Sequence, residues 1–271
     1  MKELKNYLKL IYVIPISIFL LSCQTDDDLS FYVSPNNSRT LEEVIFDFNN
    51  LTIVPGINDL TVESTFNNVF WNFRIIVPES ASDTNKRPLI MRLHGAATIV
   101  DEDLHKSTAC LIEPGFEELD AIIISPNSDG FIWYDLPNQN KILTLTNLVK
   151  NRLPVDTNKI VITGYSDGGN GAWFFAQNHP NIYSASIPMA TSYNPDRNGS
   201  PLKIDIPMYV IHGSLDQLFA LSTTQGYVNT TTEAGTELEF VIAEGLDHFN
   251  SCAYIPYLKD AATWLETSVW N

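Results

Sequence analysis

A short apolar run in the middle of this chain ends in a cluster of small residues. After Lys159, the residues Ile160–Thr163 have the continuous β-branched character of a strand that is buried on both faces of a sheet. It passes directly into Gly164–Gly169, which reads Gly-Tyr-Ser-Asp-Gly-Gly and suits the start of a closely packed helix. Because strands that alternate with helices build a parallel sheet, this junction predicts an α/β domain.

The serine in this turn is a candidate nucleophile. A serine hydroxyl is a poor nucleophile at neutral pH, so an enzyme must present it on a strained turn beside a base and beside donors for the oxyanion. A side chain at Gly164 or Gly168 would collide with the neighbouring strand or with the helix that begins after the turn. The Gly-x-Ser-x-Gly spacing therefore predicts a nucleophile elbow at Ser166.

Two later segments supply partners for this serine. The apolar run Pro207–Ile211 leads to a turn that carries Asp216, and the run Leu238–Ala243 leads to a turn that ends at His248. The order Ser, Asp, His along the chain is that of α/β-hydrolases and differs from the orders in the chymotrypsin and subtilisin folds. We expect Ser166 to attack a carbonyl carbon, His248 to transfer the proton and Asp216 to orient the imidazole.

Backbone N–H groups are the expected donors for the oxyanion. One belongs to Asp167, which follows the nucleophile, and the other to Ala96, which follows a His-Gly turn after an apolar run. Ala97 is the alternative second donor. Asp196 is the alternative triad acid, because some hydrolases supply this residue from the preceding strand.

These segments together resemble serine esterases of the α/β-hydrolase superfamily, near the polyhydroxybutyrate-depolymerase, feruloyl-esterase and acetylxylan-esterase branches. The resemblance covers residues 60–270 and rests on Leu93-His94-Gly95, Gly164–Gly169, His212–Asp216 and Asp247-His248. It implies an eight-stranded, mostly parallel sheet with helices on both faces. It also implies serine esterase activity without a cofactor, but it does not fix the substrate.

The remaining pattern agrees with such a fold. Short apolar runs typical of buried strands occur at Leu89–Leu93, Ala121–Ser125, Ile160–Thr163, Ser184–Met189, Met208–Ile211 and Leu238–Ala243. Helices are predicted at Glu102–Glu118, Gln139–Arg152 and Gly169–Gln177. Asn67-Asn68, between two β-rich runs, predicts a tight hairpin.

Two features of the loops bear on the substrate. Trp133 and Tyr134 follow the Ala121–Ser125 strand and are candidates to line an acyl or sugar subsite, although an aromatic residue there can equally be a packing anchor. Lipases insert a helical lid where this chain has only the polar loop Thr191–Lys203. We therefore expect an open site without a large lid.

The N-terminal residues predict export. Three lysines precede the apolar stretch Leu10–Leu21, which is too short to span a bilayer, and Leu20–Cys23 resembles a lipobox. We expect a signal peptide at 1–22, a lipid-modified Cys23 and a membrane anchor made of acyl chains. The acidic run Gln24–Asp28 is similar to a signal for display on the outer surface of Gram-negative bacteria, and it can also be a solvated tether.

The predicted domains are thus the signal peptide 1–22, a flexible tether 23–40 and a catalytic domain 41–271. Removal of 1–22, which carries three lysines and one glutamate, takes the formal charge from -16 to -18. Such a negative field disfavours nucleic acid as a partner. With 44% hydrophobic and 11% aromatic residues, the chain has enough apolar material for one sizeable core.

Structural roles are expected for the other two cysteines and for two of the histidines. Cys110 and Cys252 remain as a pair in an exported protein, so they form either a disulfide or two separately buried thiols. His94 and His212 stand in His-Gly turns, where structural hydrogen bonds are expected. No spacing of histidines, cysteines and acidic residues indicates a metal site.

The sequence leads to one main hypothesis. We expect an envelope serine carboxylesterase that removes short acyl or hydroxycinnamoyl groups from carbohydrate or a related polymer. One alternative is a serine peptidase on the same triad, although this chain lacks room for the propeller or cap that selects peptides. The other is a non-catalytic hydrolase-like surface protein that binds glycans or proteins.

Overall fold

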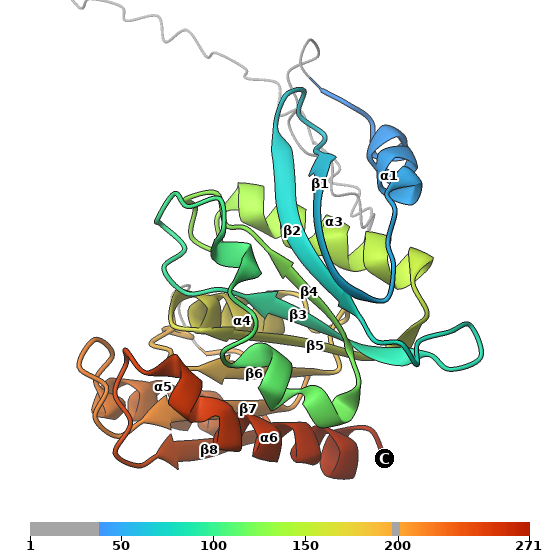
Figure 1. Ribbon diagram of the computed structural model, residues 1–271. Helices are drawn as coiled ribbons and strands as arrows, with labels where there is room; N and C mark the ends of the chain where they lie inside the picture. Colours follow the sequence, from blue (N-terminus) through green and yellow to red (C-terminus); the bar gives the residue numbers. More distant parts are fainter. Residues whose placement is uncertain (1–37, 197–200) are drawn as a thin grey trace, which may run out of the picture. The chain divides into compact units, whose positions relative to one another are not determined.

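Eight strands form one sheet in the order β1-β2-β4-β3-β5-β6-β7-β8 (Figure 1). The computed structural model describes residues 38–196 and 201–271, so the predicted signal peptide, the predicted lipidation site Cys23 and residues 23–37 of the predicted tether lie outside the described residues. The strands are β1 (Gly56–Glu63), β2 (Phe70–Val77), β3 (Arg87–Leu93), β4 (Ile122–Pro126), β5 (Val155–Tyr165), β6 (Ala185–Met189), β7 (Met208–Gly213) and β8 (Leu238–Ala243).

The sheet is antiparallel at one end and parallel elsewhere. β2 pairs antiparallel with both β1 and β4, whereas the pairs β3–β4, β3–β5, β5–β6, β6–β7 and β7–β8 are parallel. All residues of β4, β6 and β7 are buried, which explains their continuous apolar sequences. The expectation of an eight-stranded, mostly parallel sheet is confirmed.

Helices cover both faces of the sheet, as expected. They are α1 (Leu41–Asn50), α2 (Ile112–Gly115), α3 (Leu136–Arg152), α4 (Asp167–Asn178), α5 (Leu221–Glu233) and α6 (Ile255–Trp264). Short 3-10 turns occur at Leu104–Lys106, Glu117–Leu119 and Ser251–Tyr254, and one π turn at Leu265–Val269. One apolar core lies under α1, α3, α4 and α5, and the other lies under α2 and α6.

The first described residues lie against the β1–β2 hairpin. Ser38 forms a bridge with Phe66, and the Arg39 N–H donates to the carbonyl of Thr65 at 2.7 Å. Thr40 then begins α1 through a capping box with Glu43. The folded part of the chain therefore includes residues 38–40 at the end of the predicted tether.

Two predicted elements differ in the structure. The single helix predicted at Glu102–Glu118 is wrong, because only short helical turns form there. The buried guanidinium of Arg92 donates a hydrogen bond to the carbonyl oxygen of Ser107 at 2.8 Å, so this carbonyl does not accept a helical bond. Pro114 has no N–H to donate to one. The hairpin predicted at Asn67-Asn68 exists but has a longer loop, since β1 ends at Glu63 and β2 begins at Phe70.

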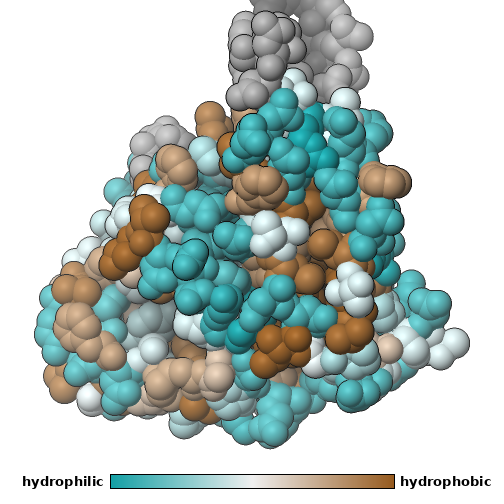
Figure 2. All heavy atoms as spheres, turned by 45° about the horizontal axis from the view of Figure 1, so that its top comes forward, coloured by the Kyte–Doolittle hydropathy of each residue, from teal (hydrophilic) through white to brown (hydrophobic). Residues whose placement is uncertain are grey.

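The described part of the segment between β6 and β7 is a loop. Its described residues, 190–196 and 201–207, contain no helix, in agreement with the prediction of a short polar loop. The helices of the described residues all fall short of the length and apolar character that a bilayer span requires. Figure 2 shows hydrophilic residues over much of one face of the molecule, with hydrophobic residues exposed between them.

Candidate active site

Ser166 lies in the sharp turn between β5 and α4. Its backbone has φ 59° and ψ -121°, a strained conformation for a residue with a side chain. A Cβ on Gly164 would lie 2.2 Å from the carbonyl oxygen of Gly168, and one on Gly168 would lie 2.0 Å from that of Leu93. The two glycines thus allow β3, β5 and α4 to approach closely enough to form a nucleophile elbow.

The three side chains predicted to form a triad meet at the carboxyl ends of the parallel strands. The Oγ atom of Ser166 is 2.8 Å from Nε2 of His248, and Nδ1 of His248 is 2.7 Å from Oδ2 of Asp216. With Nδ1–H donating to the carboxylate, Nε2 is free to accept the serine proton. Ser166 is half-buried, so it remains accessible to a substrate.

The acid of the predicted triad is fixed by hydrogen bonds. The side chain of Asp216 is completely buried, and its Oδ1 accepts the N–H groups of Leu218 at 3.0 Å and Phe219 at 2.7 Å. Asp196, the alternative acid, is exposed and its N–H donates to Asn194 within its own loop. The structure therefore places Asp216, and not Asp196, against the imidazole.

The histidine is fixed by its neighbours. The hydroxyl of Tyr165 donates to the carbonyl of His248 at 3.1 Å. A disulfide joins Cys110 to Cys252, whose Cα atoms are 5.2 Å apart, and Cys252 lies four residues after the histidine. Of the two alternatives for these cysteines, the structure shows the bonded pair, and it braces the turn that carries His248.

The expected oxyanion donors lie on either side of the serine. Asp167 is the first residue of α4, where a backbone N–H has no helical acceptor and the helix dipole favours negative charge. Gly95, next to Ala96, lies so near the elbow that a Cβ on it would be 3.4 Å from Cβ of Ser166. The alternative donor, the Ala97 N–H, is already bonded to Oδ2 of Asp167 at 3.0 Å. This geometry favours Ala96 over Ala97.

His94 holds residues 95–97, which include the expected donor Ala96 and are named the oxyanion loop. Its Nδ1 lies 2.7 Å from the carbonyl oxygen of Gly95, and its Nε2 accepts the Ser128 N–H at 3.0 Å. Burial lowers the pKa of His94 to about 3, so the ring is neutral and donates through Nδ1–H. His212 is equally structural, since its Nε2–H bonds the carbonyl of Phe219 at 2.8 Å.

The prediction that Trp133 lines the substrate site is wrong. Its side chain is 0% exposed, its indole N–H donates to the carbonyl of His94 at 2.8 Å, and its ring packs edge-on against that imidazole. Trp133 is therefore a packing anchor under the oxyanion loop. Tyr134 is half-buried against the ring of Phe174, with centroids 5.7 Å apart, and its role in substrate binding stays a prediction.

Sequence reasoning missed three side chains near the triad. The carboxylate of Asp167 binds the oxyanion loop, and the rings of Phe219 and Phe249 flank the imidazole with centroids 4.9 and 6.0 Å from it. Their only signal in the sequence is that each lies within three residues of a predicted triad member.

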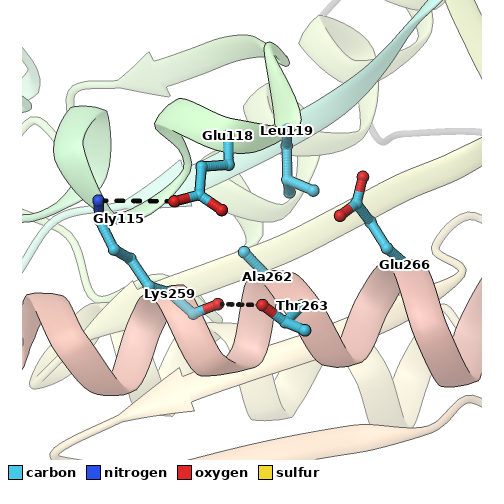
Figure 3. A pocket seen from close by; sticks show the side chains of 7 residues that line it. All are labelled: Gly115, Glu118, Leu119, Lys259, Ala262, Thr263 and Glu266. Carbon is cyan, nitrogen blue, oxygen red and sulfur yellow. Dashed lines mark hydrogen bonds and ion pairs between the residues drawn. The ribbon is translucent and has the colours of Figure 1, made fainter.

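A small surface pocket away from the predicted triad lacks such chemistry. A small pocket between α6 and the residues before β4 is lined by Gly115, Glu118, Leu119, Lys259, Ala262, Thr263 and Glu266 (Figure 3). Its Lys259, which is half-buried, pairs with the exposed Glu118 at 4.0 Å. Among the described residues, no group of three or more histidine, cysteine, aspartate and glutamate side chains is arranged to hold a metal ion.

The chain is similar to known hydrolases in part of its sequence and in its fold. Residues 137–269, just under half of the chain, match the model of the dienelactone hydrolase family. The structure is similar to that of a thermostable esterase, with 20% identity and a TM-score of 0.65 over 82% of this chain; the chain spans 63% of that esterase. Searching the curated proteins gave no significant match.

Two further solved structures share the fold. One is the fluorophosphonate-binding serine hydrolase F of Staphylococcus aureus, with 19% identity and a TM-score of 0.62 over 78% of this chain and 99% of that one. The other is a ferulic acid esterase, with 18% identity and a TM-score of 0.63 over 77% and 96%. The structure has the α/β-hydrolase fold. Its match to the family model supports a hydrolase of the dienelactone hydrolase type.

Proposed function

We propose that this protein is a serine carboxylic-ester hydrolase and that Ser166, His248 and Asp216 are its catalytic triad. The observation that carries the proposal is the continuous hydrogen-bonded chain from Oγ of Ser166 through the imidazole to the buried carboxylate. His248 takes the serine proton as Oγ attacks the ester carbonyl, and the N–H groups of Ala96 and Asp167 bind the oxyanion. The alcohol leaves with the proton, and water then hydrolyses the acyl-enzyme.

Short acyl or hydroxycinnamoyl esters of carbohydrate or a related polymer are the proposed substrates. Apolar side chains stand exposed on loops that follow the strands carrying the site, among them Ile99, Val100, Phe131 and Phe249. They suit an apolar or aromatic substrate group, and the open loop after β6 suits a bulky one. The negative charge of the chain favours a neutral substrate.

The test is hydrolysis of a small panel by residues 24–271. It contains p-nitrophenyl acetate, butyrate and palmitate, methyl ferulate, and an aminoacyl anilide, each assayed with Ser166→Ala and with Ser222→Ala. Ser222 is an exposed residue of α5, so its variant controls for the substitution itself. We expect Ser166-dependent turnover of the short or feruloyl esters only. Turnover of the anilide alone would indicate a peptidase, and the absence of any Ser166-dependent turnover would favour a binding protein.

We also propose that the protein is an exported lipoprotein, held by acyl chains on Cys23 at the outer membrane or cell surface of a Gram-negative bacterium. The lipobox-like Leu20–Cys23 and the acidic run after it support this proposal. Cys23→Ala in the full chain should move the protein from the membrane fraction to the soluble fraction. Protease treatment of intact cells distinguishes outward display from a periplasmic orientation.

A further inference from the structure

An exposed aromatic side chain stands next to the proposed catalytic histidine. Phe249 directly follows His248, and its side chain is 73% exposed although its ring lies 6.0 Å from the imidazole. Its backbone is fixed, because the N–H groups of Phe249 and Asn250 donate to Oδ1 of Asp247 at 2.9 and 3.1 Å. A large apolar surface is thus held in solvent on a rigid turn, where burial against another molecule would be favourable.

The loop of the triad acid presents apolar side chains beside the same ring. The ring of Phe219 packs edge-on against the imidazole of His248 at 4.9 Å. Leu218 is 57% exposed, and the bonds from Leu218 and Phe219 to the Asp216 carboxylate fix this loop. The imidazole therefore has apolar neighbours from both loops that carry triad residues.

The reaction indicates which half of an ester meets this surface. In the breakdown of the tetrahedral intermediate, the carbon–oxygen bond to the alcohol breaks and the imidazolium gives its proton from Nε2 to the departing oxygen. The oxygen of the alcohol must then lie within hydrogen-bond reach of Nε2 of His248. Side chains that border the imidazole consequently border the alcohol of the substrate more closely than its acyl group.

We propose that Phe249, Phe219 and Leu218 form a subsite for the leaving alcohol. The subsite takes bulky alcohols that present a flat apolar face, such as the C–H face of a pyranose ring or an alicyclic ring. This inference rests on the proposed esterase function and adds to it the part of the substrate that determines specificity. Phe249 supplies the outer surface of the subsite, and Phe219 supplies its inner wall.

The experiment compares three esters of a single acid, the one that the substrate panel ranks first. The alcohols are methanol, cyclohexanol and methyl xyloside, and kcat/KM is measured for the wild type, Phe249→Ala and Phe249→Trp. Phe46→Ala is the matched control, because Phe46 is a similarly exposed aromatic residue, at 68%, on α1. Since Phe249 is on the surface, its replacement leaves the core intact.

We expect Phe249→Ala to lower kcat/KM by about tenfold for a bulky ester and by less than about twofold for the methyl ester. Phe249→Trp should retain the activity on the bulky ester, and Phe46→Ala should change none of the three rates. The bulky ester that responds tells whether the subsite takes a sugar or a hydrocarbon ring.

Two results would overturn the inference. An equal loss on all three esters would mean that Phe249 acts only by supporting His248, and unchanged rates on both bulky esters would mean that it contacts no alcohol. Failure of the esterase proposal itself looks different, because the wild type would then show no Ser166-dependent hydrolysis of any ester.

Discussion

The carboxylate of Asp167 accepts a hydrogen bond from the backbone N–H of Ala97, with 3.0 Å between Oδ2 and N. Asp167 begins α4 directly after the proposed nucleophile, Ser166, whereas Ala97 lies 70 residues earlier, in the loop that follows β3. One residue thus contributes its own N–H to the proposed oxyanion site and uses its side chain to position the loop that carries the second donor.

Replacement of the Asp167 side chain should reduce catalysis. We expect Asp167→Ala to lower kcat by about tenfold to a hundredfold with little change in KM, because the Ala96 donor loses its support while its N–H group remains. Asp167→Asn should retain most of the activity, since the amide oxygen can accept the same bond. Steady-state kinetics on a short ester measure both parameters. If the asparagine variant were as slow as the alanine variant, the hydrogen bond would not be the reason for the effect.

His94 should make the protein sensitive to acid. Its pKa is about 3 in the folded protein because the ring is buried, whereas an unfolded histidine titrates near 6.5. Between these values the unfolded chain binds the extra proton, so stability falls as the pH falls below 6.5. At pH 4.5 this single group should cost about 3 kcal/mol of the free energy of unfolding.

Urea unfolding at pH 7 and pH 4.5 measures this dependence. The control is His94→Asn, which is less stable than the wild type at pH 7 but has no imidazole to take up the proton. Its free energy of unfolding should therefore fall less between pH 7 and pH 4.5 than that of the wild type. An equal difference in both proteins would assign the acid sensitivity to other groups. His105, His179 and His212 also have pKa values lowered mainly by burial and contribute with the same sign.

The parallel strands and the elbow could be predicted from sequence because each is a local pattern. A run such as Ile160–Thr163 followed by Gly164–Gly169 specifies a strand, a turn and a helix within a few residues. The segment Glu102–Glu118 could not be predicted in this way. Its carbonyls bond to the distant guanidinium of Arg92, and no local propensity reports such a contact.

The candidate site also combines residues that the sequence predicts with residues whose roles depend on distant contacts. Ser166, Asp216 and His248 each stand at the end of an apolar strand, so topology alone predicts that they meet. Trp133 also follows a strand, but its indole is buried against His94, and burial depends on contacts that a sequence does not display. The side-chain bond of Asp167 was missed for the same reason.

Loss of the disulfide between Cys110 and Cys252 should destabilise the protein. The bond closes a loop with a sequence separation of 142 residues, so we expect a loss of about 2–5 kcal/mol in the free energy of unfolding when both cysteines are replaced by serine. Residues 24–271 contain no other cysteine, so a reducing agent should shift the melting temperature of the wild type and leave that of the double variant unchanged. A double variant with the melting temperature of the oxidised wild type would show that the bond adds nothing to stability.

Two glycine-to-alanine substitutions test the close approach at the elbow. A Cβ on Gly168 would lie 2.0 Å from the carbonyl oxygen of Leu93 and 2.8 Å from that of His94, so β3 or α4 must move. We expect Gly168→Ala to lose about 3 kcal/mol or more, or to be insoluble, together with its esterase activity. Gly226 is the control, because it lies in α5 with no atom within 4 Å of a Cβ.

Gly226→Ala should instead stabilise the protein by about 0.5–1 kcal/mol, since alanine favours a helix and loses less backbone entropy on folding. Thermal unfolding of both variants, followed by circular dichroism, measures the contrast. Both substitutions add the same methyl group. If Gly168→Ala destabilises the protein while Gly226→Ala stabilises it, the loss of stability comes from the contact with Leu93 and not from the change to alanine itself. If both variants melted at or above the wild-type temperature, β3 and α4 could separate without cost, and the close packing assigned to the elbow would be wrong.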